Sequence, residues 1–206
     1  MGQISVNNAL VLGFTFVIAG LTFLYLINPL CAMLGAISIF IYACVYTPLK
    51  LITPLSVFVG AIPGAIPFML GWVAATNELG VEALALFLMQ FFWQFPHFWA
   101  IAWVAHEDYS KAGFKLLPAD KGPTKFTAIQ GIMYSVLMIP VGILPYYFGY
   151  TGMTSAVIVI MCNVFMVVQS IRLYQQMDVK SARRVMFSSY IYLPIVLLAL
   201  LADKIK

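Results

Sequence analysis

Charged side chains are scarce in this sequence. Only 9% of its 206 residues are Asp, Glu, Lys or Arg, whereas 63% are hydrophobic. An ordinary soluble domain carries about 25% charged residues. So little polar surface cannot cover a water-soluble globule, which excludes that class of protein. We therefore expect the lipid bilayer to be the solvent for most of the chain.

The sequence also has few cysteines and none of the common catalytic motifs. Cys31, Cys44 and Cys162 are widely spaced in apolar runs, which excludes a zinc-binding spacing or a disulfide framework. No HExxH, Ser-His-Asp order or phosphate-cradling glycine loop occurs. No block of Lys and Arg is long enough to follow a phosphate backbone, so we expect no nucleic acid partner.

Long apolar runs dominate what remains. A membrane helix needs about 20 mainly apolar residues, and seven such segments are present. Their ranges are 9–27, 30–46, 54–75, 81–105, 126–148, 152–174 and 185–202. Because the runs do not alternate strictly, they predict helices rather than a barrel. The predicted fold class is all-α, a transmembrane bundle of seven helices.

The basic residues predict the orientation of this bundle. With seven spans, nine of the 11 Lys and Arg residues fall on one side of the membrane. They are Lys50, Lys111, Lys115, Lys121, Lys125, Arg172, Lys180, Arg183 and Arg184. Lys204 and Lys206 fall on the other side. The positive-inside rule places the N-terminus and the basic loops in the cytoplasm and the C-terminus outside.

The third span, "PLSVFVGAIPGAIPFMLGW", is rich in glycine and proline. Gly60 and Gly64 are four residues apart, which permits close helix approach. Pro63 and Pro67 leave carbonyl groups without their usual helical donors, and these groups need other partners. The pattern fits either a kinked packing helix or a helix that lines a cavity.

The fourth span ends in an ionic patch, within "FFWQFPHFWAIAWVAHEDYSKAGFKLLP". If the helix continues through Asp108, His97 and Asp108 share one face, which we expect to point inward. Trp93 lies deep in the span and fits either packing or a flat apolar ligand.

Two carboxylates and several lysines gather beyond this span. Glu107 and Asp108 are adjacent, and Lys111 follows three residues after Asp108. They can be a solvated loop with one local ion pair, or a site for Mg²⁺ and a diphosphate, because Mg²⁺ takes one or two carboxylates plus phosphate oxygens. Lys111, Lys115 and Lys121 would then neutralise the rest of the anion. Lys50, on the same side, either reaches a phosphate or only marks the topology.

Four stretches together resemble the protohaem IX farnesyltransferases (haem O synthases), which are UbiA-type intramembrane prenyltransferases. They are "YTPLK" with "VGAIPGAIPFMLGW", "PHFWAIAWVAHEDYSKAGFKLLP", "MYSVLMIPVGILPYYFGYTG" and "ARRVMFSSYIYLP". They occur in the family's order, and the resemblance covers essentially the whole chain. The second stretch is the most specific.

The resemblance implies an activity and a set of site residues. The family transfers farnesyl from farnesyl diphosphate to the vinyl group of haem b, which is a substrate and not a prosthetic group, and it uses Mg²⁺ with the diphosphate. The family's second acidic motif corresponds to Asp108 and Tyr109, with Glu107 beside them. The histidine of its "PH" element corresponds to His97, a haem-facing position, and a basic loop position corresponds to Lys50.

The sequence departs from the family at its start. The family's first acidic motif, of the "NxxxD" kind, precedes a "TGQIS"-like sequence, whereas this chain begins "MGQIS" and has no Asp or Glu before Glu78. We therefore expect a single membrane domain over residues 1–206, with seven of the family's nine helices and without the first acidic motif.

Two other functions remain open at this point. One is prenylation of a different acceptor, such as a quinone precursor. The other is a non-catalytic membrane protein or transporter, which the absent acidic motif favours. In the leading interpretation the protein lies in a bacterial inner membrane and contacts a haem A synthase or the assembly of a terminal oxidase.

Overall fold

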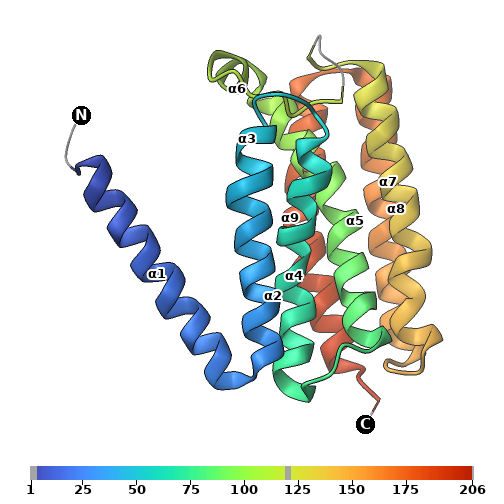
Figure 1. Cartoon of the computed structure of the whole chain (residues 1–206). Coiled ribbons are helices and arrows are strands. Elements are labelled where there is room, and N and C mark those ends of the chain that lie inside the picture. Colours follow the sequence, from blue (N-terminus) through green and yellow to red (C-terminus); the bar gives the residue numbers. More distant parts are fainter. Residues whose placement is uncertain (1–3, 119–121, 206) are drawn as a thin grey trace.

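A computed structural model describes residues 4–118 and 122–205, which form an all-α bundle (Figure 1). Within this part of the chain, seven helices are long and apolar enough to cross a membrane. They span Val6–Ile27, Pro29–Leu49, Ser56–Thr76, Val81–Val104, Lys125–Tyr147, Met153–Gln176 and Val179–Ala202. The predicted fold class and the number of spans are confirmed. Lys121 and Lys206, both counted in the charge pattern, lie outside the described residues.

The second span has three consecutive parts, and the others are single helices. The helices are α1 (Val6–Ile27), α2 (Pro29–Phe40), the π-helix η1 (Ile41–Tyr46), α3 (Thr47–Leu49), α4 (Ser56–Thr76), α5 (Val81–Val104), α6 (His106–Lys111), α7 (Lys125–Tyr147), α8 (Met153–Gln176) and α9 (Val179–Ala202). Asn28 allows α1 and α2 to follow each other directly. Its side chain caps α2 by accepting from Cys31 N–H (2.7 Å) and donates to the Val73 carbonyl oxygen of α4 (3.0 Å).

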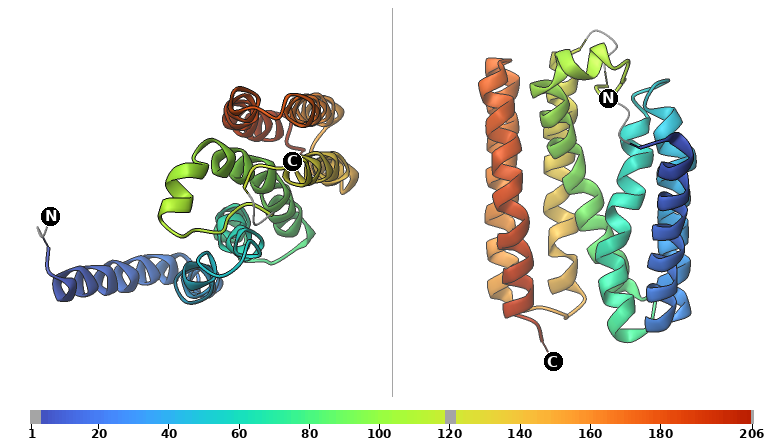
Figure 2. Two further views of the ribbon diagram at one scale, coloured as in Figure 1. Left: turned by 90° about the horizontal axis from the view of Figure 1, so that it is seen from above. Right: turned by 90° about the vertical axis from the view of Figure 1, so that its left-hand side faces the viewer.

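Helix α5 lies at the centre of the bundle and packs against α4, α7 and α9. Helices α7, α8 and α9 form a compact group on one side of it, and α2 and α4 lie on the other (Figure 2). Helix α1 diverges from the bundle, packs chiefly on α2 and has no buried residue (Figure 1). Its apolar surface suits contact with lipid.

Polar side chains join α7, α8 and α9 inside their shared core. Asn163 of α8 donates to the Met138 carbonyl oxygen of α7 (2.9 Å) and accepts from the Tyr192 hydroxyl of α9 (2.7 Å). Ser135 and Ser170 hydroxyls lie 3.0 Å apart between α7 and α8. Such interhelical hydrogen bonds contribute about 0.6 kcal/mol each in membrane proteins and fix which helix faces meet.

The last span begins earlier than the hydropathy indicated. We expected it at residue 185, but α9 begins at Val179. The added turn contains Lys180, Arg183 and Arg184, which lower the hydropathy there. Asp178 caps this turn by accepting a hydrogen bond from Ser181 N–H (2.7 Å), so the helix starts in the basic loop and not at the apolar boundary.

The Asp178 cap should make stability depend on pH. Hydrogen bonding with Ser181, through its side chain and its backbone, holds the pKa of this carboxyl below its usual range. A depressed folded-state pKa stabilises the fold above the unfolded pKa of about 4, and this contribution is lost as pH falls through the folded pKa. Asp178→Ala should lower the thermal midpoint at neutral pH, and the difference from the parent should shrink in acid. Asp178→Asn is the control, because it keeps a capping oxygen but has no carboxyl to titrate. If the contribution of residue 178 to the thermal midpoint fell in acid in this variant as well, the account would be contradicted.

Candidate functional site

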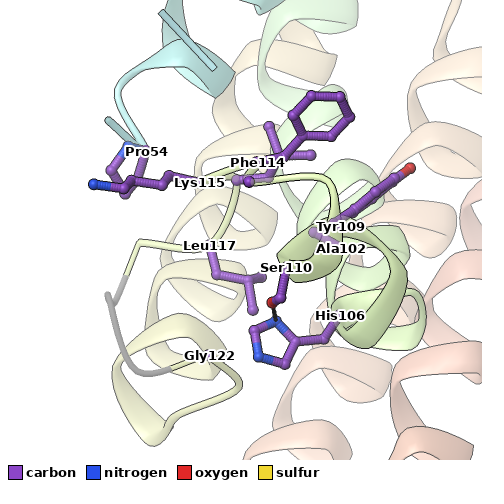
Figure 3. A pocket seen from close by; sticks show the side chains of 11 residues that line it. Pro54, Ala102, His106, Tyr109, Ser110, Phe114, Lys115, Leu117 and Gly122 are labelled. Atoms are coloured by element: carbon purple, nitrogen blue, oxygen red, sulfur yellow. Dashed lines mark hydrogen bonds between the residues drawn. The ribbon is translucent and has the colours of Figure 1, made fainter. Parts of the chain in front are cut away.

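Two cavities lie at the end of the bundle that carries α6. The core cavity, of about 500 Å³, opens between α2, η1, α4 and α5. Its lining is Ser38, Ile39, Tyr42, Ala43, Tyr46, Val57, Gly60, Pro63, Gly64, Gln94, Phe98, Ile101, Tyr109 and Leu116. The rim cavity, of about 390 Å³, adjoins it and lies between the loop before α4 and the α6 segment (Figure 3). The two cavities share Tyr109 and Leu116.

Helix α4 lines the core cavity with its glycine- and proline-rich face. Because Pro67 has no N–H, the Pro63 carbonyl oxygen lacks its helical donor, and the Ser38 hydroxyl of α2 donates to it instead (3.2 Å). Gln94 of α5 donates to the Ala61 carbonyl oxygen (2.9 Å). Of the two interpretations of this span, the cavity-lining helix is confirmed, and the carbonyl group left without a donor by Pro67 is met by a polar side chain of the cavity wall.

Two tyrosines that the sequence analysis did not single out form the opposite wall. Tyr42 and Tyr46 belong to the π-helix η1, and their ring centroids lie 5.3 Å apart. A Cβ atom added at Gly60 would lie 2.7 Å from the Tyr46 ring, so the glycine lets the ring lie flat against α4. π-helical turns occur often at functional sites. The four-residue spacing of Tyr42 and Tyr46 at the basic end of a span was the signal in the sequence that could have identified them.

A backbone hydrogen bond ties together the two loops that carry the predicted lysines. Lys115 N–H donates to the Lys50 carbonyl oxygen (2.8 Å). The Lys50 ammonium lies 4.7 Å from the centre of the Phe114 ring, a cation–π distance. Figure 3 shows Lys115 and Phe114 on the same loop, beside Pro54. The structure therefore brings Lys50 and Lys115 together at the rim, although they are far apart in sequence.

The carboxylates do not continue the inner face of the fourth span. Helix α5 ends at Val104, Ala105 leaves helical geometry (φ −99°, ψ 22°), and α6 starts at His106. The expected continuous face from His97 to Asp108 is therefore wrong. Glu107 and Asp108 are exposed and line neither cavity.

Tyr109 is the residue of this motif that reaches the cavities. It follows Asp108 directly and lines both the core cavity and the rim cavity (Figure 3). Lys111, in the last turn of α6, is exposed and lies outside both linings. The acidic motif thus stands at the edge of the site, and its tyrosine connects that edge to the apolar interior.

His97 and Trp93 are buried between α5 and α9. Their rings stack with centroids 4.5 Å apart, and His97 Nδ1 lies 2.7 Å from the Ser189 hydroxyl oxygen. Since that hydroxyl donates to the Met186 carbonyl oxygen (2.6 Å), Nδ1 carries the proton and donates to Ser189. Nε2 is therefore left as the acceptor. Neither residue lines the core cavity or the rim cavity, but His97 contacts Phe98 of the core cavity wall, with ring centroids 5.1 Å apart.

The donor set at the rim fits a magnesium ion that is bound mainly by a phosphate ligand. The described residues contain no group of three or more His, Cys, Asp or Glu side chains that could enclose a metal. Mg²⁺ commonly takes only one or two carboxylates when phosphates and water supply the other ligands. Glu107 and Asp108 are exposed oxygen donors of that kind. Alone they cannot form a closed metal site.

Comparison with known sequences places the chain in a family. Residues 1–192 match the UbiA prenyltransferase family. The chain is similar to the protoheme IX farnesyltransferase of Flavobacterium psychrophilum, at 53% identity over 98% of this chain and 69% of that protein. It is also similar to the protoheme IX farnesyltransferase of Cytophaga hutchinsonii, at 48% identity over 99% of this chain and 72% of that protein.

A solved structure supports the same fold. A structure described as digeranylgeranylglyceryl phosphate synthase in membranes superposes with a TM-score of 0.81, covering 98% of this chain and 71% of that one. At 22% identity this likeness concerns the fold alone. The matched family, the similar sequences and the shared fold agree: this chain belongs to the UbiA prenyltransferase family.

Proposed function

We propose that this protein transfers a farnesyl group from farnesyl diphosphate to a vinyl group of haem b and so makes haem O. The similar proteins at 47–53% identity are named protoheme IX farnesyltransferase. The observation that carries the proposal is the core cavity, an apolar space that reaches, through Tyr109, the edge where the carboxylates and lysines gather. A prenyl diphosphate has the same division into an apolar tail and an anionic head.

The farnesyl tail is proposed to lie in the core cavity. Its walls include the rings of Tyr42, Tyr46 and Phe98, and its volume of about 500 Å³ falls in the range of ordinary ligand pockets, about 300–1,000 Å³. Gly60 and Gly64 keep side chains out of the space between α4 and its neighbours. Water is poorly accommodated by such walls, which protects a reactive allylic carbon from hydrolysis.

The diphosphate is proposed to lie at the rim. Lys50 and Lys115 are joined through their backbones there, and Lys111 is on the adjacent α6. Their ammonium groups stabilise the negative charge that the diphosphate gains as the bond from its oxygen to farnesyl C1 breaks. Asp108 and Glu107 would hold Mg²⁺, which supplies further charge neutralisation when bound. The vinyl carbon then forms a bond to C1, and water adds to the resulting cation with loss of a proton.

Haem b is proposed to approach from the side of His97 and Trp93. These two rings are stacked, and the Tyr190 ring meets His97 with centroids 5.1 Å apart. Trp93 and His97 are themselves buried, so the flat surface that suits a porphyrin face is the exposed Tyr190 ring beside them. Ser189 acts as a positioning residue, because its hydrogen bond holds Nδ1 protonated and leaves Nε2 as an acceptor.

The positions of the basic loops support a proposal for how the bundle is oriented in the membrane. Helices α3 and α6 lie at one end, and the described C-terminal segment lies at the other (Figure 1). We propose that the end with α6 faces the cytoplasm of a bacterial inner membrane, because the basic loops gather there. The product would be passed on within the bilayer to a haem A synthase or to the assembly of a terminal oxidase.

The direct test is a reaction with defined substrates. Purified protein in lipid nanodiscs, given haem b, farnesyl diphosphate and Mg²⁺, should yield a haem whose mass has increased by one hydroxyfarnesyl group. A quinone-ring acceptor in place of haem b is the control and should remain unmodified. Modification of the quinone ring alone would assign the protein to another acceptor, and absence of both products would remove the transferase proposal for this chain.

Asp108→Asn should weaken Mg²⁺-dependent binding of farnesyl diphosphate by about tenfold or more, the scale of one lost interaction with a charged group, while helix content is retained. Isothermal titration with and without Mg²⁺ measures this difference. Glu78→Gln is the matched control, because Glu78 is an exposed loop carboxylate at the opposite end of the bundle. Equal binding by both variants would remove Asp108 from the site.

A further inference from the structure

A third cavity, the far cavity, lies at the end of the bundle opposite α6. Its volume is about 570 Å³, and its walls come from α4, α5, the end of α7 and α9. The walls are mainly apolar and include Phe68, Trp72, Leu86 and Leu197. Gly71 of α4 lines this cavity, and a Cβ atom added there would meet nothing within 4 Å. The apolar floor of the cavity, beside Gly71, is therefore open space. The proposed transfer reaction uses none of these residues.

Backbone hydrogen bonds hold the mouth of the far cavity in place. The segment after α9 pairs with the turn between α7 and α8 through a bridge between Thr151 and Lys204. Gly152 N–H donates to the Asp203 carbonyl oxygen (3.0 Å), and Ile205 N–H donates to the Tyr150 carbonyl oxygen (2.9 Å). The Asp203 carboxylate also accepts from Ser155 N–H at the start of α8 (2.7 Å). The backbone that carries Tyr150, Thr151 and Lys204 is therefore held in a fixed position.

The mouth carries both signs of charge and a hydroxyl without a partner. The Lys204 ammonium lies 5.7 Å from the centre of the Trp72 ring, and Glu82 enters from the start of α5. Interaction with the nearby Glu82 carboxylate raises the pKa of the Tyr150 hydroxyl. Thr151 is 5% exposed, and its hydroxyl has no hydrogen-bond partner among residues 4–118 and 122–205.

We propose that the far cavity binds one zwitterionic phospholipid with a primary amine, of the phosphatidylethanolamine class. An acyl chain fills the apolar space beside Gly71, the phosphate lies near Lys204, and the ammonium group donates to Glu82. A purely anionic headgroup would meet the Glu82 carboxylate, and a quaternary ammonium group has no N–H to donate. The mixed charge of the mouth therefore selects among lipids that share the same chains.

Native mass spectrometry tests this binding without using the transfer reaction. The detergent-solubilised chain is incubated with equal amounts of phosphatidylethanolamine, phosphatidylcholine and phosphatidylglycerol of identical acyl chains. One phosphatidylethanolamine should be retained per chain, in preference to the other two. Glu82→Gln and Lys204→Gln should each weaken its retention by about tenfold, the scale of one hydrogen bond to a charged group. A preference for phosphatidylglycerol, or no preference, would overturn the proposal.

Filling the cavity gives a second test. Gly71→Leu places a side chain in the apolar floor and should abolish retention of the lipid. Gly20→Leu is the matched control, since Gly20 of α1 also has open space beside it but lies far from the cavity. Circular dichroism and gel filtration confirm that each variant folds. Equal retention by Gly71→Leu and Gly20→Leu would show that the lipid binds elsewhere and would contradict the assignment.

Discussion

One backbone hydrogen bond, from Lys115 N–H to the Lys50 carbonyl oxygen (2.8 Å), joins the loop after α3 to the loop after α6. It sets the two lysines beside each other at the rim, where Phe114 lies within cation–π distance of the Lys50 ammonium. Mobile loops would have to lose conformational entropy before their charges could act together. The hydrogen bond removes part of that cost in advance, and the proposed diphosphate site depends on it.

The core cavity, at the same end of the molecule, depends on a departure from regular helix in α4. In lipid every carbonyl group needs a donor, so the missing N–H of Pro67 must be compensated within the protein. Ser38 provides that compensation across the α2–α4 contact, and both Ser38 and Pro63 line the core cavity. The π-helix η1 opposite completes the wall with Tyr42 and Tyr46. Local departures from regular helix thus create the apolar space in a bundle that would otherwise close.

The sequence predicted the fold well because bilayer thickness fixes helix length and hydropathy marks the spans. It also identified α4 as unusual, since glycine and proline have backbone consequences wherever they occur. It failed at the boundary of α5 and α6, because the break at Ala105 has no proline or glycine to mark it. Consequently Asp108 was expected on the inner face with His97, whereas Tyr109 is the residue that enters the cavities. The pairing of His97 with Ser189, 92 residues apart, depends on tertiary packing that periodicity cannot reveal.

The most direct measurement of the central claim is photolabelling with a farnesyl diphosphate that carries a diazirine on its tail, followed by peptide mapping. The account predicts Mg²⁺-dependent labels on the core cavity wall, around Tyr42 of η1, Gly60 of α4 and Phe98 of α5. Excess unlabelled farnesyl diphosphate should compete them away. Labels confined to α1, which has no buried residue, or labels that resist competition, would mean that the tail lies in bulk lipid and would contradict the account.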